Sequence, residues 1–407
     1  MSKLKRLHDL EDRILSCVSI GDCRGALKGS YSNPILESTC PMRDHGPGFE
    51  AFFARGRFTI ARALLNEKIK PTNGLSEVIY QCNLCGACRE VCNNPENPCM
   101  SVPARESIGD HIEIWEGLRA DLVDIGVAPL PYHKEIFEHE KLEHNPYFER
   151  HADRTNWIPK EAKFPQKGGE YFFFVGCTSS YRINQLSITF LEIARKINLK
   201  LAISPEEWCC GSINLRTGTQ KLFKKVAEHN YNVFKNSSSQ KIITTCAGCY
   251  KTIKHDYPNY IDDWNFEVKH SIELIDDLIN QNKIKFENKL DGNITYHDPC
   301  HLGRHSGIYN APRNVIDAIS KNGLIEMRRN RKYSYCCGAG GGVKSVFSEL
   351  ALEIAEDRVK EAEETEAQYL STTCPFCLNN LKEAALKIKS KIEVVDLLEL
   401  VKETIYP

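Results

Sequence analysis

Cysteine is the residue type whose number and spacing could do chemistry in this chain, since it occurs 18 times in 407 residues. Ten of these cysteines fall into two sets of five that share their order and nearly share their spacing. The first set is Cys177, then 31 residues, Cys209–Cys210, then 35 residues, and Cys246-x2-Cys249. The second set is Cys300, then 35 residues, Cys336–Cys337, then 36 residues, and Cys374-x2-Cys377. A spacing that occurs twice indicates a duplicated metal site rather than a framework of disulfides.

Each five-cysteine set holds one thiolate more than a common metal site requires. Structural zinc takes four ligands, and an ordinary [4Fe-4S] cluster takes four thiolates. The fifth cysteine favours a cluster with bridging thiolates, or a site that exchanges thiols with its substrate. A Cys-x2-Cys pair that opens a helix directs two thiolates to one metal, and the helix N-terminus stabilises their charge. Zinc in one of the two sets, or a redox dithiol without metal, remains an alternative.

Strands that alternate with helices position these cysteines from residue 171 onward. Strands are predicted over 171–176, 241–245, 294–298 and 368–373, and helices over 187–199, 270–281, 312–321, 348–364 and 393–403. Cys177, Cys246, Cys300 and Cys374 each follow one of the predicted strands. Because ligands of open parallel sheets bind at the carboxyl ends of strands, this order predicts an α/β fold with small parallel sheets and its sites at those ends.

The order of strands and helices repeats after about 125 residues, which predicts a duplicated domain. The first copy is expected over 168–285 and the second over 290–407. Apolar patterns typical of helices occur before them, at 55–69 and 111–126, so residues 1–150 are expected to form a helical N-terminal domain. The polar stretch 135–170, which is rich in proline and glycine towards its end, is interpreted as a linker.

A second cysteine motif lies in the N-terminal domain. Cys82-x2-Cys85-x2-Cys88-x3-Cys92 has the spacing of bacterial ferredoxins and predicts a cubane [4Fe-4S] cluster. In ferredoxins with two clusters, the fourth cysteine of each run serves the other cluster. Cys40–Pro41 resembles the fourth position of a first run, so Cys82, Cys85, Cys88 and Cys40 are assigned to one cluster. Residues 1–150 are therefore interpreted as a ferredoxin-like iron–sulfur domain.

The other run of this ferredoxin-like domain is incomplete. Cys17 and Cys23 occupy the outer positions of a C-x2-C-x2-C pattern whose middle position is Ile20. Cys92 lacks the usual following proline, and Cys99 is an additional cysteine seven residues later. Three outcomes stay open. Cys99 completes a cubane with Cys17, Cys23 and Cys92, or three ligands hold a [3Fe-4S] cluster, or the site is empty and the cysteines are small core residues.

Four stretches resemble the CCG-domain iron–sulfur family, which includes the D subunit of heterodisulfide reductase and fused ferredoxin–CCG proteins. They are FFVGCTSSYR (173–182), YHDPCHLGRHSGIYNAPR (296–313), CCGAGGG (336–342) and TCPFCLNNL (373–381). The resemblance extends over about residues 80–407 and is poor before them. It implies that each complete set of five cysteines holds a noncubane [4Fe-4S] cluster. It also implies that the two clusters face each other at a pseudo-twofold interface and cleave a disulfide.

Histidines near Cys300 are candidates for proton delivery to a leaving thiolate, since imidazole titrates near neutrality. They are His297, His301 and His305, with His301 as the expected donor and a purely structural role as the equal alternative. Arg304 is expected to pair with an anionic substrate group or to neutralise an anionic cluster. Gly338, Gly340, Gly341 and Gly342 do not complete a phosphate loop, because Val343 rather than glycine precedes Lys344–Ser345. No dinucleotide fingerprint occurs either, so no nucleotide or flavin is expected in this chain.

Composition and charge exclude several classes of partner. The chain is 42% hydrophobic and 26% charged, and its net charge of -1 favours neither nucleic acid nor an anionic membrane. The charged start MSKLKRLHDLEDR lacks the apolar core of a secretory signal. No run of about 18 apolar residues occurs. We therefore expect a cytoplasmic protein that reaches a membrane only through a partner.

The leading hypothesis is an oxidoreductase, the catalytic component of a complex, that reduces or reversibly forms a disulfide of the heterodisulfide type. Electrons would come from a flavoprotein, ferredoxin or cytochrome b partner through the N-terminal clusters. The alternative is a pure electron-transfer component of a flavin-dependent 2-hydroxy acid or glycerol-3-phosphate dehydrogenase, and a third hypothesis is a zinc-containing scaffold. The candidate catalytic residues are the ten cysteines of the two sets and His301. The candidate ligands of the N-terminal clusters are Cys82, Cys85, Cys88, Cys40, Cys17, Cys23, Cys92 and Cys99.

Overall fold

The structure of this chain is a computed structural model that describes residues 4–19, 21, 23, 25–30, 33–92, 107–159, 165–286 and 288–406. The chain divides into two compact units. The first unit comprises Met1–Glu135, Ile213–Gln220 and Arg329–Arg358, and the second comprises Ile136–Ser212, Lys221–Arg328 and Val359–Pro407. The sequence predicted three domains instead, and that three-domain division remains a proposal.

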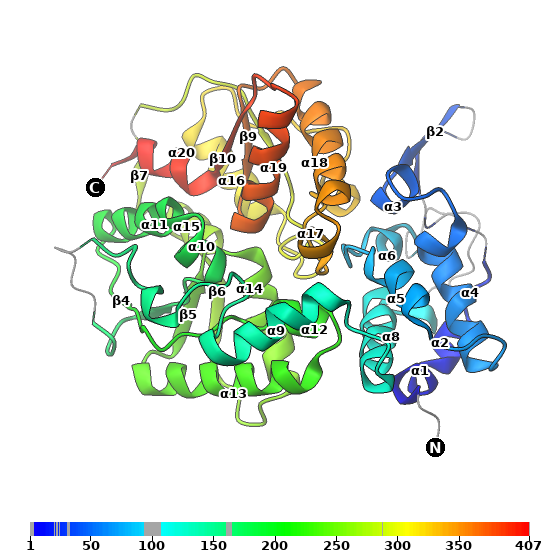
Figure 1. The fold of residues 1–407 in the computed structure, drawn as a ribbon. Coiled ribbons are helices and arrows are strands. Elements are labelled where there is room, and N and C mark those ends of the chain that lie inside the picture. The colour runs from blue at the N-terminus through cyan, green and yellow to red at the C-terminus, as the bar shows by residue number, and fades with distance from the viewer. Residues whose placement is uncertain are drawn as a thin grey trace. The chain divides into compact units, whose positions relative to one another are not determined.

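The first unit is mainly helical and confirms both predicted N-terminal helices, as α4 (Ala54–Leu65) and α8 (His111–Ile125). Phe58 and Leu64 of α4 pack with Trp115 and Leu118 of α8 in one apolar core. Its other helices before residue 131 include α1 (Lys5–Asp9), α2 (Glu11–Leu15), α3 (Pro41–Asp44), α5 (Asn73–Tyr80) and α6 (Ala87–Cys92). Strands β1 (Gly25–Ser30) and β2 (Asn33–Ser38) form an antiparallel pair. Figure 1 shows these elements in blue and cyan.

The second unit contains two small parallel sheets, as the sequence predicted. The first sheet has the order β4-β3-β5-β6, with all neighbours parallel. Its strands are β3 (Tyr171–Phe173), β4 (Leu201–Ala202), β5 (Lys241–Thr244) and β6 (Glu267–His270). The helices among them are α10 (Cys177–Tyr181), α11 (Asn184–Lys196), α13 (Gln220–Ser237), α14 (Ala247–Lys251) and α15 (Ser271–Asn280).

The second sheet repeats the order of the first. Its parallel order is β10-β9-β8, formed by β8 (Ile294–Tyr296), β9 (Tyr369–Thr372) and β10 (Glu393–Asp396). Strand β8 corresponds to β3 of the first sheet. An isolated parallel bridge joins Ile294 of β8 to Leu324, on the side of β8 away from β9, and so takes the place that β4 has beside β3. Its helices are α16 (Asn310–Ile319), α19 (Pro375–Lys387) and α20 (Leu397–Thr404). Helix α18 (Ser348–Glu363) begins in the first unit and ends in the second. This equivalence supports the predicted duplication.

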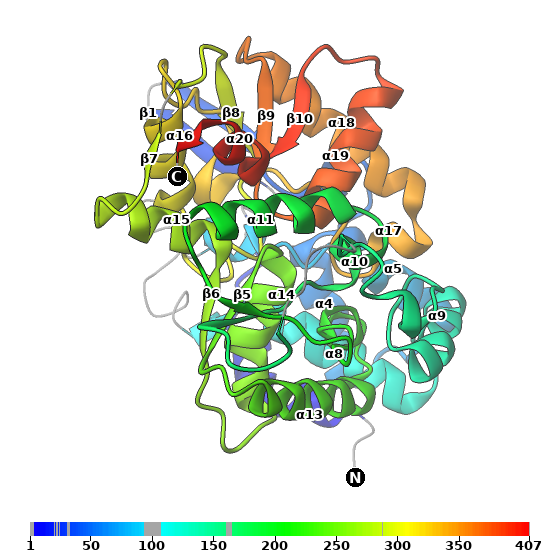
Figure 2. The same cartoon turned by 90° about the vertical axis from the view of Figure 1, so that its left-hand side faces the viewer.

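Helices of the two copies pack against each other within the second unit. In Figure 2, α11 and α15 cross between the two sheets, with α16 and α20 on the side of the second sheet. Helix α11 contacts α20, and α15 contacts α16. The two copies therefore share one apolar layer of helices.

The helix predicted over 393–403 is wrong at its start, because residues 393–396 form strand β10. Val394 and Val395 are β-branched and favour a strand, and Asp396 then caps α20 by accepting from the Leu398 N–H at 2.9 Å. His270 caps α15 in the same way after β6. The stretch 135–170 is not a simple linker either, since it includes most of α9 (Pro131–Glu143) and a 3-10 turn at His151–Asp153.

No helix among the described residues is long and apolar enough to cross a membrane.

Candidate metal centres

The five cysteines of the first set gather at the carboxyl ends of the strands of the first sheet. Cys177 begins α10 four residues after β3 ends, and Cys246 caps α14 two residues after β5 ends. Cys209 and Cys210 lie in the turn that follows β4. All five side chains are buried, with exposed fractions between 5% and 8%. The expected placement at strand ends is therefore what the structure shows for this set.

The turn after each cysteine pair has a conformation that glycine favours. Gly211 has φ of 79° and its N–H donates to Sγ of Cys209 at 3.4 Å. Gly338 repeats this, with φ of 85° and an N–H that donates to Sγ of Cys336 at 3.3 Å. Glycine adopts this positive φ without strain, and its N–H also contacts the sulfur of the first cysteine of each pair.

The thiols of the first set are in hydrogen-bond contact in a chain that runs Cys177, Cys209, Cys210, Cys249 and Cys246. Burial, and then the contact with Cys209, raise the pKa of Cys177 well above its usual range. The pKa of Cys210 is lowered to about 6, because hydrogen bonds from Cys209 and Cys249 stabilise its thiolate. Five buried sulfurs cannot all carry negative charge without a compensating cation. An iron–sulfur cluster would supply that cation, so the donor set fits one.

The second set is divided between the two units. Cys300, Cys374 and Cys377 belong to the second unit, whereas Cys336 and Cys337 belong to the first. All five are buried. Cys300 follows β8, and Cys374 follows β9 and occupies the N-cap position of α19. Within the second unit, the side chains of Cys246 and Cys374 are in hydrogen-bond contact, so the Cys-x2-Cys pairs of the two copies meet.

Histidines surround Cys300 as the sequence indicated. The Nδ1 atom of His301 lies 3.7 Å from Sγ of Cys300, and the rings of His301 and His305 are 5.1 Å apart. His297 is 1% exposed and its backbone N–H donates to the carbonyl of Ser371 at 2.8 Å. His301 is thus the histidine whose side chain lies closest to the Cys300 sulfur among these contacts.

The first unit brings together the four cysteines that the sequence assigned to one N-terminal cluster. Burial, together with the neighbouring thiols Cys85, Cys82 and Cys23, raises the pKa of Cys40 to about 12, against an opposing effect of Arg57. Burial likewise raises the pKa of Cys88, with added repulsion from Cys82, Cys23, Cys85 and Cys40. Cys40 and Cys85 are buried, and Cys82 and Cys88 are half-buried. This set of thiols also fits a cationic cluster.

Cys23 belongs to this gathering as well, which spacing arguments did not predict. They had paired it with Cys17, Cys92 and Cys99. Cys17, Cys23 and Cys92 all contribute to the same apolar core of the first unit. Cys99 lies outside the described residues, so the three outcomes for the second N-terminal cluster stay open. The cysteines that the structure describes are all free thiols.

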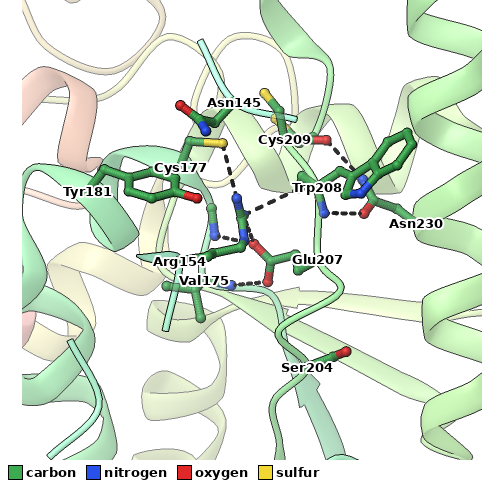
Figure 3. A network of polar contacts seen from close by, with 12 residues as sticks. Asn145, Arg154, Val175, Cys177, Tyr181, Ser204, Glu207, Trp208, Cys209 and Asn230 are labelled. Carbon is green, nitrogen blue, oxygen red and sulfur yellow. Dashed lines mark hydrogen bonds and ion pairs between the residues drawn. The ribbon is translucent and has the colours of Figure 1, made fainter. Parts of the chain in front are cut away.

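Two charged residues at the first set have no signal in the sequence pattern. Arg154 donates to Sγ of Cys177 at 3.5 Å, and it forms an ion pair with Glu207. Both side chains are buried, with exposed fractions of 2% and 1%. Figure 3 shows the guanidinium between the Cys177 sulfur and the Glu207 carboxylate. Arg154 stands in the stretch interpreted as a linker, where an isolated arginine indicates nothing by itself.

Comparison with known proteins agrees with the geometry of the two sets. Residues 171–254 and 294–382 match the CCG family, described as a cysteine-rich domain. The D subunit of the dihydromethanophenazine:CoB–CoM heterodisulfide reductase from Methanosarcina mazei is 38% identical over 334 residues, which are 80% of this chain and 78% of that protein. The chain belongs to the family of heterodisulfide reductase D subunits. Family membership makes it an iron–sulfur oxidoreductase component with two CCG domains, as the resemblance implied.

Relatives of this family carry different names for their reactions. The B subunit of a CoM/CoB fumarate reductase from Methanothermobacter marburgensis is 31% identical over 369 residues, which are 89% of this chain and 69% of that protein. An EtfAB:quinone oxidoreductase from Syntrophomonas wolfei is 28% identical over 437 residues, which are 97% of this chain and 58% of that protein. Several relatives are named as subunits of larger enzymes, so membership of this family implies partner chains.

Proposed function

We propose that this chain is the component of a redox complex that reduces, or reversibly forms, a small-molecule disulfide of the heterodisulfide type. The observation that carries the proposal is the continuous contact of five buried thiols in the first set. A second set with the same five-cysteine spacing supports it. The similarity to heterodisulfide reductase D subunits adds the class of substrate.

The ten cysteines of the two CCG domains would hold noncubane [4Fe-4S] clusters, and bound clusters would supply the two electrons that cleavage of a disulfide requires. The chain itself buries the sulfurs, which excludes water from the site. The Gly211 and Gly338 N–H groups orient the first sulfur of each cysteine pair. His301, 3.7 Å from Sγ of Cys300, is the proposed proton donor to a leaving thiolate.

The N-terminal cysteines would hold one or two further clusters, a cubane at Cys82, Cys85, Cys88 and Cys40 and a cubane or [3Fe-4S] cluster at the remaining cysteines. A flavoprotein, ferredoxin or cytochrome b chain is the proposed electron partner, and the cytoplasm is the proposed location. Any membrane contact would then run through that partner.

An electron-transfer component without disulfide chemistry is the second candidate. It is favoured by the EtfAB:quinone oxidoreductase, whose similarity extends over 97% of this chain although its name mentions no disulfide. In that case the chain would serve a flavin-dependent 2-hydroxy acid, glycerol-3-phosphate or related dehydrogenase.

The test uses full-length protein purified without oxygen. Iron, sulfide and zinc are counted per chain, and free thiols are then measured after a CoM–CoB-type heterodisulfide and a reduced viologen are added. About twelve irons with one N-terminal cluster, or about fifteen to sixteen with two, are expected, together with no zinc and heterodisulfide-dependent thiol release. About eight irons with no thiol release would favour the electron-transfer component. Zinc near one per chain would overturn the pair of noncubane clusters.

A pair of histidine variants separates the proposed proton donor from its neighbour. His301→Asn is expected to lower the turnover number by about a hundredfold or more, which is the usual contribution of a positioned acid. His305→Asn is the matched control, because His305 is on the same loop and its ring lies 5.1 Å from the ring of His301. Equal turnover in both variants would assign His301 to the shape of the loop.

A further inference from the structure

Arg154 is a buried cation that reaches the first cysteine set from outside the CCG repeat. Its Nη1 donates to Sγ of Cys177 at 3.5 Å. It precedes the first segment that matches the cysteine-rich domain, which begins at residue 171. Arginine keeps its charge at any physiological pH, so Cys177 always faces a positive group.

Glu207 holds this guanidinium in place through contacts with three partners. One carboxylate oxygen accepts from the N–H of Val175 at 2.8 Å, and the other accepts from the N–H of Gly176 at 2.9 Å. The same carboxylate pairs with Arg154. Because Val175 and Gly176 immediately precede Cys177 and Glu207 precedes Cys209 by two residues, the carboxylate joins the two loops that carry these cysteines.

The Arg154–Glu207 ion pair has no net charge, but its positive group is the one that faces the Cys177 sulfur. Two backbone N–H groups share the negative charge of Glu207, and Nη1 of Arg154 points at Cys177. The backbone carbonyl of Trp208 accepts from Nη2 at 3.3 Å and so also fixes the orientation of the fork. Figure 3 shows the positive end of the pair directed at the Cys177 sulfur. In a buried site this charge is screened little by solvent.

The second cysteine set has different residues at the corresponding positions. Ser334 stands two residues before Cys336, where Glu207 stands before Cys209. Cys300 is followed by His301, whose Nδ1 lies 3.7 Å from its sulfur, whereas Cys177 is followed by Thr178. The carboxylate that anchors the permanent cation is thus present in the first copy and replaced by serine in the second.

We propose that Arg154 is a positioning residue that raises the reduction potential of the first cysteine set through its hydrogen bond and charge at Cys177. Potentials of protein-bound clusters depend on net charge and on hydrogen bonds to the sulfurs. Reduction by one electron adds one negative charge, which a cation beside Cys177 stabilises. The inference rests on the proposed cluster at this set, but it does not require that the substrate be a disulfide.

The test is an EPR-monitored redox titration of the full-length, anaerobically purified chain without substrate. Arg154→Met removes the charge and the hydrogen bond, and Arg154→Lys keeps the charge without the fork. We expect Arg154→Met to lower the midpoint potential of one signal by at least a tenfold change in its reduction equilibrium, about 59 mV for a one-electron couple. Arg154→Lys should lie between Arg154→Met and the unchanged chain.

Arg182→Met is the matched control, because it removes a positive charge five residues from Cys177. Arg182 pairs with Glu149, and both side chains are more than one-third exposed. All midpoint potentials should stay unchanged in this variant, since solvent screens its charge.

A double variant keeps the inference testable if Arg154→Met alone does not fold, because that change leaves Glu207 buried without its partner. Arg154→Met with Glu207→Gln removes both charges and should retain the iron content and the lowered potential. Unchanged potentials in the iron-loaded double variant would overturn the inference, as would equal potentials for Arg154→Lys and Arg154→Met. A chain that binds no iron at the first set before any substitution would overturn the proposed function on which the inference rests.

Discussion

Alanine at the glycine of each CCG turn is expected to destabilise the protein by different amounts in the two copies. Gly211 and Gly338 both have positive φ, and alanine in that region costs about 1–2 kcal/mol. The surroundings add a second cost. A Cβ on Gly211 would stand 2.7 Å from Cδ2 of Phe223, whereas a Cβ on Gly338 would stand 2.3 Å from the backbone carbonyl oxygen of Ala351.

A phenylalanine ring can rotate away, but the carbonyl of a residue in α18 can move only with its helix. We therefore expect Gly211→Ala to cost about 2–3 kcal/mol and Gly338→Ala to cost about 3–5 kcal/mol, using about 1–3 kcal/mol for overpacking. Since each glycine N–H donates to a cysteine sulfur, the shift should also weaken metal retention at that set.

Two glycines elsewhere allow the cost of the backbone conformation to be measured without a steric clash. Gly126 in the first unit has φ of 94° and Gly307 in the second has φ of 77°, and no atom lies within 4 Å of a Cβ on either. Alanine at these positions should cost about 1–2 kcal/mol and leave iron binding unchanged.

Thermal unfolding under nitrogen and iron per chain are the two measurements. From most to least stable, the expected order is the two control variants, then Gly211→Ala, and then Gly338→Ala. Only the last two are expected to lose metal, and Gly338→Ala should lose more. A Gly338→Ala protein as stable as Gly126→Ala would refute the reasoning from close approach to Ala351. Normal iron in both CCG variants would refute the role given to the two glycine N–H groups.

Two further predictions concern the first unit. His111 is 1% exposed and burial lowers its pKa to about 4, so the folded chain resists a proton that the unfolded chain takes up near pH 6.5. Stability should fall as pH drops from about 6.5 towards 4, by up to about 3 kcal/mol, and His111→Phe should flatten that dependence in melting temperatures compared with the unchanged chain. Cys23→Ser should remove more iron than Cys17→Ser, because Cys23 lies with Cys40 and Cys88; equal losses would indicate a separate site shared by Cys17 and Cys23.

Local signals in the sequence predicted the elements of the fold that repeat. Cys-x2-Cys before an apolar run predicted a helix start, and Cys246 and Cys374 do occupy the N-cap positions of helices. Alternating strands and helices predicted parallel sheets at the right places. Helix α13 and the short strands β4 and β6 were not predicted. A short boundary was also wrong, since Val394 and Val395 belong to a strand of four residues directly before a capped helix. A pattern that short is dominated by the longer helical signal behind it.

The residues that pack around each cysteine site were harder to predict than the cysteines themselves. Spacing assigned Cys40 to the group of Cys82, Cys85 and Cys88, because ferredoxin connectivity follows the order of the cysteines. Spacing did not place Cys23 there, since its neighbours come from helices and loops that only packing brings together. Arg154 and Glu207 are 53 residues apart, and neither has a motif around it.

Duplication preserves the parts of a site that the backbone determines and leaves the rest free to differ. The strand ends, the CCG turn and the helix caps are features of the repeated segments, and both copies have them. Arg154 comes from a segment before the first matched CCG domain, so duplication of that domain alone would not have copied it. Its anchor, Glu207, is inside the repeat and is replaced by Ser334 in the second copy. Equal cysteine spacing therefore predicts the same set of cysteine ligands in both copies. The charged residues beside each site are not predicted by that spacing and have to be identified individually in the structure.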